Sequence, residues 1–496
     1  MFSELALTGI ALAFLAYFWR RFSSKPASNL PPGPEATSVW GNFKDLDTDG
    51  VHRSLHKLFE KYGPVVHIRL LKRHVVILNT SDVMRKAFDT VEFEECLNDK
   101  AKGFFGTYLV YGHADILLGP YTERTFRLKE VMHKGLQPSM STKQLQSELQ
   151  QLVDGFKNQI GKDFCPRKSI ESSIAGIMTM LIAGERKDND EKIISDFVFW
   201  SNKLLSPRVE SLLKNLPFLR HFPGEPGSLY ALAKKKRDIL LQRFLTDYRE
   251  TYKAGINRGL VDTCLNIQEL ETQKDGSCWL TDDMIRALIL DTIGGGFVST
   301  SNTILATILN LLNNRRCLDK MVEEINAVLS NGKFCTWADV KIMPYCYAVI
   351  LETQRYSTLV PIVSHYCSTK DVEFEGYTIP RDTMVWGNIW SGHHDEAAWT
   401  NAWTFNPERF LDSTGNLLPE EDPLRKRLIP LGVGKRYCVG SDFAMSRLFT
   451  YIVTLVQHFD ILSPKDTELV SGNPNNYTGG AVLQVEDFML RVERRN

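Results

Sequence analysis

The sequence LGVGKRYCVG at residues 431–440 brackets one cysteine with glycines and runs into a helix-like segment at 441–455. Gly434 and Gly440 let the backbone bend and come close to a flat group, which a Cβ atom would hinder. Cys438, at the start of a helix, would have its thiolate favoured by unpaired amide groups and by the helix dipole. The stretch therefore predicts a thiolate ligand for haem iron. Taken alone, it also fits a buried structural cysteine in a glycine-rich turn.

Two further charged motifs precede this loop. Glu352 and Arg355 stand at i and i+3 in the helix-like segment 345–356, so they share one helical face. Alone, such a pair is usually a solvated surface pair. Arg409, in the sequence FNPERF at 405–410, supplies a second arginine that could share Glu352. A buried triad of this kind needs every charge partnered and would fix geometry more than it adds stability.

Composition restricts the class of protein. The chain has 496 residues, with 43% hydrophobic and 24% charged, which suits a globular protein with a substantial core. Lysine plus arginine and aspartate plus glutamate both number 59, so the balanced charge argues against a dedicated nucleic-acid binder. Nine scattered cysteines without CxxC pairs indicate neither a disulfide framework nor a zinc site. A reducing, cytosol-facing body is the simpler inference.

The N-terminus predicts a single membrane anchor at 1–22. Residues 1–19 are apolar apart from Glu4 and a few small polar side chains, and two arginines follow. A span of about eighteen apolar residues approaches the bilayer thickness, and the basic pair after it keeps the body cytoplasmic. A cleaved signal peptide and a buried core helix are the alternatives. The proline-rich segment 23–35 predicts a stiff hinge, and 36–496 the catalytic domain.

Hydrophobic patterning predicts a mainly α fold with small β-sheets in one large unit. A long apolar helix is expected at 284–312. Its apolar run is broken only by the glycines at 294–296, each of which lowers helix stability by about 1 kcal/mol relative to alanine. The remaining expectations are strands at 67–70, 75–78, 372–377 and 384–386, helices through most of 81–330, loops near 103–120 and 207–226, and a helix from Ser441.

The three motifs, in this order behind an anchor and a proline-rich hinge, resemble the cytochrome P-450 superfamily of haem-thiolate monooxygenases. The likeness covers nearly the whole chain and is strongest to the animal microsomal members. It implies haem b as cofactor, Cys438 as the iron ligand, and a structural network behind it. The residues implied for the structural network are Glu352, Arg355 and Arg409. Those implied for haem contacts are Arg436, His365, Arg127, Gly434 and Gly440.

Some haem contacts depart from the family pattern. Thr122 stands where the family usually has tryptophan, and Phe126 where it has arginine, so Arg127 or Arg124 is expected to take over a propionate. His365 alone would also suit an ordinary, partly buried histidine. Leu431 replaces the phenylalanine that usually begins the haem loop.

The proton-delivery residues also depart. Where the family has an acid followed by a threonine, this chain has Val298 and Ser299, and valine carries no proton. Ser299 and Thr300 are the predicted catalytic hydroxyls, with backbone capping at a helix break as the alternative. Asp291, two helical turns earlier, could feed water from a distance. Water or a substrate hydroxyl is the remaining route.

The resemblance implies a lipophilic substrate such as a steroid, fatty acid or aromatic xenobiotic, on the cytoplasmic face of the endoplasmic reticulum. NADPH-cytochrome reductase is the expected electron donor, with cytochrome b5 as a second candidate. A basic cluster near the loop predicts a binding surface for an acidic flavoprotein. The alternative is an ordinary basic surface that contacts only solvent. A peroxide isomerase or dehydratase that needs no reductase, and a haem protein that binds a ligand without turnover, stay open. Members of the basic cluster are Arg425, Lys426, Arg427, Lys435, Lys129 and Lys134.

Overall fold

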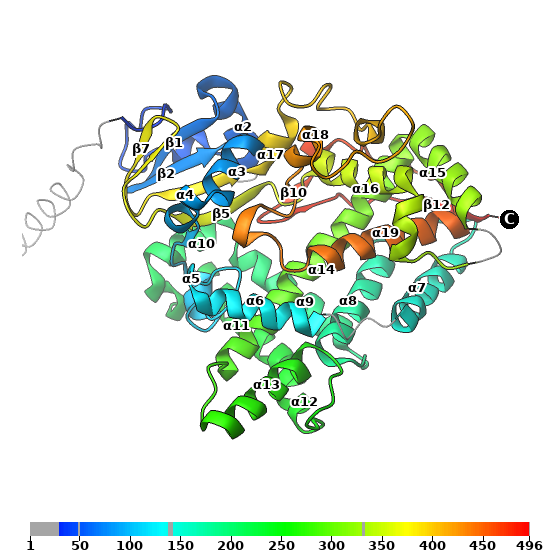
Figure 1. Cartoon of the computed structure of the whole chain (residues 1–496), viewed down its shortest axis with the longest axis horizontal. Helices are drawn as coiled ribbons and strands as arrows, with labels where there is room; N and C mark the ends of the chain where they lie inside the picture. Colours follow the sequence, from blue (N-terminus) through cyan, green and yellow to red (C-terminus); the bar gives the residue numbers. More distant parts are fainter. Residues whose placement is uncertain (1–28, 48–49, 137–141, 330–332, 496) are drawn as a thin grey trace, which may run out of the picture.

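The computed structural model describes residues 29–47, 50–136, 142–329 and 333–495 (Figure 1). The predicted anchor at 1–22 lies outside these ranges. Within them, no helix combines the length and the apolar character needed to cross a bilayer.

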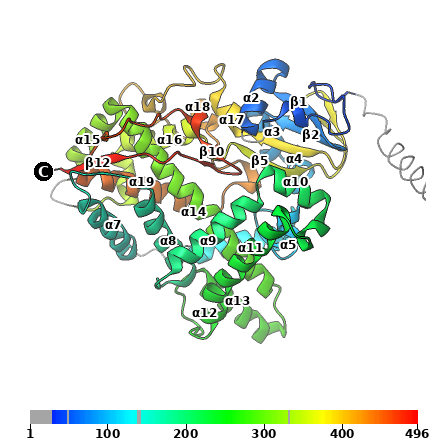
Figure 2. The same cartoon turned by 180° about the vertical axis from the view of Figure 1, so that it is seen from behind.

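Helices make up most of the molecule and pack around one long central helix, α14, at Asp282–Asn313. Figure 2 shows α14 passing between the helices of the lower part and α16 and α19. The other α-helices are α2 Val51–Tyr62, α3 Ser81–Asp89, α4 Val91–Leu97, α5 Phe104–Tyr108, α6 Glu123–Leu136, α7 Thr142–Lys157, α8 Arg167–Ala183, α9 Asp190–Leu204, α10 Pro207–Asn215, α11 Glu225–Leu241, α12 Asp247–Arg249, α13 Leu260–Asp275, α15 Arg315–Val328, α16 Pro344–Ser357, α17 Ile389–His394, α18 Pro423–Arg427 and α19 Ser441–His458.

The strands gather mainly in one lobe beside the helices, coloured blue and yellow in Figure 1. The largest sheet has the order β1-β2-β8-β5-β3, with β1 and β2 as an antiparallel hairpin and β8 parallel to β2. The strands are β1 Val65–Leu70, β2 Arg73–Leu78, β3 Asp99–Lys100, β4 Asp163–Phe164, β5 Ile362–Cys367, β6 Val372–Phe374, β7 Tyr377–Ile379, β8 Met384–Asn388, β9 Phe459–Leu462, β10 Thr478–Gly479, β11 Leu483–Gln484 and β12 Leu490–Arg494. The predicted mainly α architecture with small sheets is confirmed.

Helix α14 starts where its sequence supplies a cap and continues through the glycines. The Thr281 side chain accepts a hydrogen bond from the Met284 amide, which satisfies one of the free N–H groups at the helix start. The helix then runs for 32 residues without interruption, about 48 Å at the usual rise. Gly294 and Gly295 therefore leave open space beside an unbroken helix, whereas Gly296 lies close to Met178 of α8. Capping at a helix break does not occur there.

The expected loops at 103–120 and 207–226 are wrong in part. Helix α5 lies within the first, and α10 with a 3-10 helix at Pro217–His221 lies within the second. Pro207 and Pro217 each stand at the first helical position, where proline lacks only an N–H group that would be unpaired anyway. The two prolines, which favoured loops in the sequence analysis, therefore begin short helices instead.

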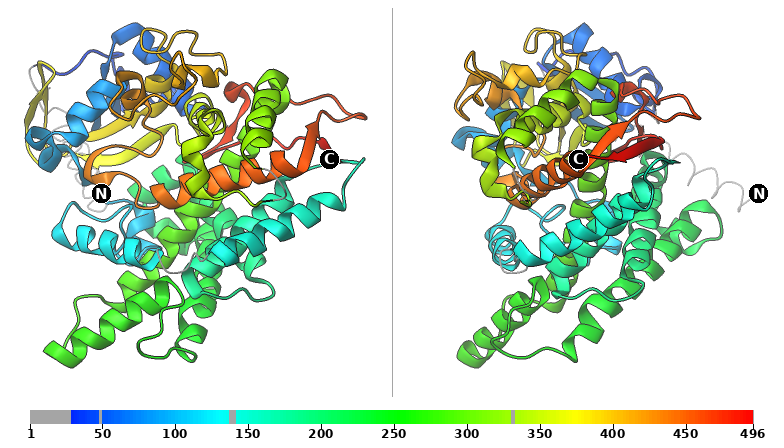
Figure 3. Two further views of the ribbon diagram at one scale, coloured as in Figure 1. Left: turned by 45° about the vertical axis from the view of Figure 1, so that its right-hand side comes forward. Right: turned by 90° about the vertical axis from the view of Figure 1, so that its right-hand side faces the viewer.

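Helix α19, orange in Figure 3, carries the cysteine loop at its N-terminal end and packs against α14, α16 and α7. Its middle is buried on almost every side, including Phe449, Tyr451 and Ile452. Packing of this kind fixes the start of α19 relative to the central helix. The cysteine loop and the glycine face of α14 therefore belong to one rigid core.

Candidate functional site

The loop before α19 is a compact series of backbone turns. The Cys438 amide donates to the Leu431 carbonyl oxygen at 2.9 Å, and the Tyr437 amide to that of Gly434 at 2.9 Å. Gly434 has φ +65°, and a Cβ atom built there would lie 2.1 Å from the carbonyl oxygen of Phe88 on α3. Gly434 is thus required by the close approach of α3.

Helix α6 clamps the same loop from the other side. Lys129 donates from Nζ to the carbonyl oxygens of Lys435 at 2.7 Å and Tyr437 at 3.0 Å. Lys435 in turn pairs with Glu94 of α4 at 2.7 Å. Two lysines from the predicted basic cluster therefore already hold the loop in place.

Cys438 lies two residues after the 3-10 turn Gly434–Arg436. Its side chain is accessible, although protein surrounds it closely enough that burial raises the pKa of its thiol. The Gly440 amide and the charge of Lys129 oppose this shift. Helix α19 begins only at Ser441, three residues later, so the helix dipole is a weaker influence than the sequence suggested.

A cavity of about 60 Å³ lies between α14, α16 and the start of the cysteine loop. Helix α14 contributes three hydroxyl side chains to its wall. The lining residues are Ser299, Thr300, Thr303, Thr353, Gln354, Thr358, Leu359, Val360, Pro430, Leu431, Ala444 and Leu448. The cavity thus joins the predicted catalytic hydroxyls to the cysteine loop.

The predicted charge network is present, and its Glu352–Arg355 pair is fully buried. Arg355 donates from Nε and Nη2 to the two Glu352 carboxylate oxygens, both at 2.8 Å, and neither side chain is exposed. Arg409 Nε lies 3.1 Å from the same carboxylate, and the Asn406 amide donates to it at 2.9 Å. The surface-pair alternative is excluded by this burial.

The hydroxyls of α14 differ in how they are engaged. The Ser299, Ser301 and Thr303 hydroxyls each donate to the backbone carbonyl four residues earlier. Among the described residues, the Thr300 hydroxyl has no hydrogen-bond partner, although the residue is 4% exposed and lines the cavity. Val298 is buried beside them. Thr300 is therefore the freer of the two predicted catalytic hydroxyls.

Asp291 faces the segment between α5 and α6. Its carboxylate accepts a hydrogen bond from the Ile116 amide at 2.8 Å. Burial raises the pKa of Asp291 well above its usual value, and the nearby carboxylate of Asp115 adds to this. Asp291 thus ties α14 to that segment.

The expected propionate contacts fall into two groups. Arg436 points toward the segment after α5, donating to the carbonyl oxygens of Ile116 at 3.0 Å and Gly119 at 2.8 Å. Arg127 lies elsewhere: its guanidinium stacks 4.0 Å over Trp279 and lies 3.7 Å from Glu271. The turn of α6 that directs Lys129 to the loop directs Arg127 to α13.

Sequence reasoning missed one cation on the Arg436 side. Lys100, on β3, donates from Nζ to the Ser364 carbonyl oxygen at 3.2 Å and lies 3.5 Å over the Tyr366 ring. Burial and the neighbouring Arg436 lower the pKa of Lys100 well below its usual value. His365 lies on β5 beside these residues, and its side chain is outside the described atoms. A lone lysine before a glycine-rich segment gave no sequence signal.

Comparison with known proteins decides the family. A model described as "Cytochrome P450" matches residues 31–491. This chain belongs to the cytochrome P450 family. It is 29% identical to cytochrome P450 2B12 of Rattus norvegicus, with 97% of each chain covered. It is also 29% identical to cytochrome P450 2B4 of Oryctolagus cuniculus, covering 95% of this chain and 96% of that one. Farnesoate epoxidase of Bombyx mori is 27% identical, with 98% of each chain covered.

Membership confirms the superfamily and the fold predicted from the motifs, and this P450 is a haem-thiolate monooxygenase with haem b as cofactor. The residues present fit that group. A Cβ atom built on Gly294 or Gly295 of α14, or on Gly440, meets no atom within 4 Å. Open space therefore lies against the glycine face of α14 and against the cysteine loop, as a flat macrocycle requires.

The polar side of the site fits the propionates. The buried Nε atoms of Arg124 and Arg436 have no hydrogen-bond partner among the described residues. Each is a donor. With Lys100, they make a donor set suited to two carboxylates.

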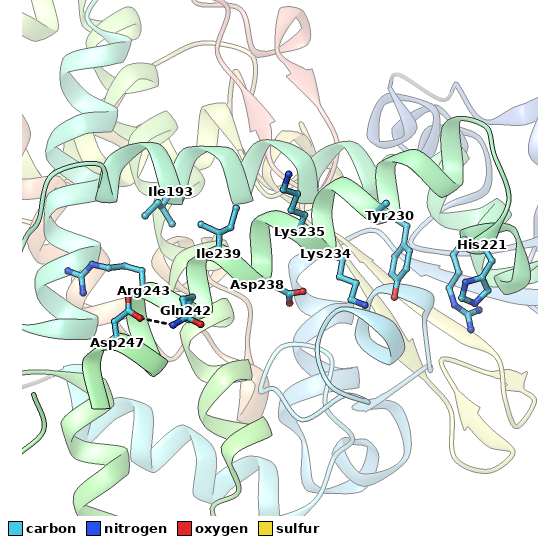
Figure 4. A pocket seen from close by; sticks show the side chains of 12 residues that line it. Ile193, His221, Tyr230, Lys234, Lys235, Asp238, Ile239, Gln242, Arg243 and Asp247 are labelled. Carbon is cyan, nitrogen blue, oxygen red and sulfur yellow. Dashed lines mark hydrogen bonds between the residues drawn. The ribbon is translucent and has the colours of Figure 1, made fainter. Parts of the chain in front are cut away.

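A second cavity of this P450 lies away from the cysteine loop, with no residue of 431–440 in its wall. It holds about 790 Å³ along α11, with Ile193 of α9 on its other wall (Figure 4). Its acids are engaged: Asp238 pairs with Arg237, and Asp247 accepts from Gln242.

Proposed function

We propose that this P450 inserts one oxygen atom of dioxygen into a lipophilic substrate, with electrons from NADPH delivered through a reductase, and that Cys438 is the iron ligand. The observation that carries the proposal is the position of Cys438. Cys438 is accessible in the loop that α3 and α6 clamp, and Leu431 of the same loop shares a cavity wall with Ser299 and Thr300 of α14.

Bound haem would supply the oxygen chemistry, with a thiolate ligand that favours cleavage of the O–O bond. As a metal ligand, Cys438 would be held as the thiolate, although burial raises the pKa of its thiol. Arg436, Arg124 and Lys100 would hold the propionates. Glu352, Arg355 and Arg409 would fix the chain behind the loop.

Proton delivery would pass through the cavity wall of α14. Val298 cannot supply a proton, so a hydroxyl must relay one from water. Thr300 is free to donate and accept, whereas Ser299 donates to the Gly295 carbonyl oxygen. We assign Thr300 the larger share of this role, with Ser299 second.

A lipophilic substrate and a membrane location are supported by exposed apolar side chains. Leu216, Phe218 and Phe222 are exposed in and beside the 3-10 helix at Pro217–His221, as are Val39 and Trp40 near the predicted hinge. Exposed apolar groups of this size mark membrane or partner contacts. They support the predicted anchor at 1–22 and an endoplasmic reticulum location. The farnesoate of the Bombyx mori relative, an isoprenoid acid, is one lipophilic class to test.

One observation favours a second candidate function. Val298, buried in α14, stands where the family usually has the acid that oxygen activation uses. An isomerase or dehydratase acting on a lipid hydroperoxide needs neither that acid nor a reductase. NADPH-cytochrome reductase, with cytochrome b5 as a second donor, belongs only to the first candidate.

Spectroscopy and turnover test the two candidates. The reduced protein with carbon monoxide is expected to show the red-shifted Soret band of thiolate ligation. Cys438→Ala should abolish it, and Cys165→Ala, at a half-buried cysteine outside the loop, should leave it unchanged. A band retained by Cys438→Ala would refute the ligand assignment. Substrate-dependent NADPH consumption with a reductase supports the monooxygenase, and turnover of a lipid hydroperoxide without NADPH supports the isomerase.

A further inference from the structure

His393 lies at the end of α17, behind the cysteine loop, and is 0% exposed. This residue was not singled out from the sequence, because its partners lie far from it in the chain. The imidazole nevertheless contacts two segments that are distant in the chain. One is Ile429, which leads into the cysteine loop, and the other is Thr358 at the end of α16.

The ring bonds to the loop through its acceptor nitrogen. The Ile429 amide donates to His393 Nε2 at 3.0 Å in a fully buried contact. Because Nε2 accepts, the proton of the neutral ring resides on Nδ1, which donates to the Thr358 hydroxyl at 3.0 Å. Thr358 then donates to the Arg355 carbonyl oxygen at 2.6 Å. Burial lowers the pKa of His393 to about 3, which keeps the ring in this neutral form.

Short backbone bonds carry the restraint from Ile429 to the sulfur. The Gly432 amide donates to the Ile429 carbonyl oxygen at 3.1 Å, and the Cys438 amide to that of Leu431 at 2.9 Å. Because His393 holds Ile429 in place, it also holds the turn to which the Cys438 backbone is hydrogen-bonded.

The backbone of His393 closes the link on the other side. Its carbonyl oxygen accepts a hydrogen bond from Arg355 Nη1 at 2.8 Å. Thr358, the partner of Nδ1, has φ +35° at the end of α16 and lines the cavity beside Leu359. One residue thus joins the Glu352–Arg355 pair, the cavity wall and the cysteine loop.

We infer that His393 is a positioning residue for the thiolate: its neutral imidazole holds the cysteine loop in register with α16. The inference rests on the proposed ligation by Cys438. An apolar side chain here would leave the Ile429 amide buried without an acceptor, which costs more than an average hydrogen bond contributes. The loop would then relax away from α16 before the rest of the fold is lost.

His394 provides a matched control in the same buried turn. Its ring nitrogens face the carbonyl oxygens of Trp390 at 2.9 Å and Tyr356 at 3.1 Å, and neither belongs to the cysteine loop. Both histidines are buried to a similar extent. His394→Leu therefore removes a buried imidazole without removing the acceptor of Ile429.

The test follows the ferrous carbon monoxide complex of the full-length holoenzyme. His393→Leu should lose the thiolate Soret band about tenfold faster than wild type in mild urea, as expected for one buried amide left without an acceptor. His393→Gln, which keeps an acceptor near Ile429, should restore the rate to within about twofold. The ferric to ferrous midpoint potential should shift in His393→Leu and return in His393→Gln. His394→Leu should lower the unfolding midpoint without accelerating loss of the band.

Two results would overturn the inference. In one, His393→Leu loses the band no faster than wild type. In the other, His393→Gln and His394→Leu lose it as fast as His393→Leu, which indicates general destabilisation. A wild-type protein without any thiolate band would instead refute ligation by Cys438, so the two failures are distinguishable.

Discussion

The Glu352 carboxylate accepts two hydrogen bonds from Arg355, both at 2.8 Å, and lies 3.1 Å from Arg409. The guanidinium groups of Arg355 and Arg409 are therefore both paired with one carboxylate that is shielded from water. Glu352→Gln leaves both cations buried with a neutral partner, so it should lower the free energy of unfolding by about 3–5 kcal/mol. Urea unfolding of the purified protein measures this loss.

Glu408 supplies the control for that prediction. It pairs with Lys320 at 2.6 Å and Arg316 at 3.3 Å, but these side chains are partly or largely exposed. Glu408→Gln should therefore cost about 1 kcal/mol or less. Equal losses for Glu352→Gln and Glu408→Gln would show that burial of the network has no special energetic role.

The two glycines that flank Cys438 should respond differently to alanine. Gly434→Ala must adopt φ +65° and place its Cβ atom 2.1 Å from the Phe88 carbonyl oxygen, so α3 and the loop must separate. Gly440→Ala meets no atom within 4 Å. Gly434→Ala should lower stability by at least about 2 kcal/mol, and Gly440→Ala by much less. Thermal unfolding of the two variants tests this difference, and similar losses would contradict it.

Motifs with several constrained positions could be predicted from the sequence, because spacing alone specifies their chemistry. Glu352 and Arg355 are neighbours on any helix, and the order of the three motifs indicated the family. The strands at 67–70 and 75–78 were predicted as two short runs joined by a basic turn, and the structure pairs them as the β1–β2 hairpin. Each of these features is local or has a fixed sequence separation.

Features that depend on distant contacts could not be predicted. Lys100 lies beside Arg436 only because β3 pairs with β5 at the sheet edge. Arg127 and Lys129 differ by two positions, yet the turn of α6 sends one to Trp279 and the other to the cysteine loop. His393 acquires its role from the folded position of Ile429. Sequence separation carries no information on such pairs.

Acid should destabilise the fold through its buried neutral histidines. Burial lowers the pKa of His52 to about 4, with the charge of Arg53 as a further cause. The unfolded chain therefore binds a proton at His52 below about pH 6.5, whereas the folded chain does so only near pH 4. Stability contributed by neutral His52 is full above pH 6.5 and falls as the pH decreases, by roughly 2 kcal/mol at pH 5.

A variant isolates this contribution from other titrating groups. His52→Phe keeps a ring against Trp390, whose centroid lies 4.6 Å from that of His52, and cannot bind a proton. Between pH 7 and pH 5, its free energy of unfolding should fall by about 2 kcal/mol less than that of wild type. Parallel pH profiles in urea unfolding would show that His52 is not held neutral in the fold.

Thr300 should control how efficiently reducing equivalents reach product. Its hydroxyl is uncommitted at the cavity, so Thr300→Val removes the relay while keeping the shape of the side chain. The ratio of released hydrogen peroxide to product should rise at least about tenfold, and Thr300→Ser should restore coupling. Ser299→Ala should raise it less, because that hydroxyl is bound to Gly295. Ser301→Ala, whose hydroxyl donates to Phe297 away from the cavity, should leave it unchanged. A larger effect for Ser299→Ala than for Thr300→Val would move the relay to Ser299, and no effect for either would place proton delivery on water or on the substrate.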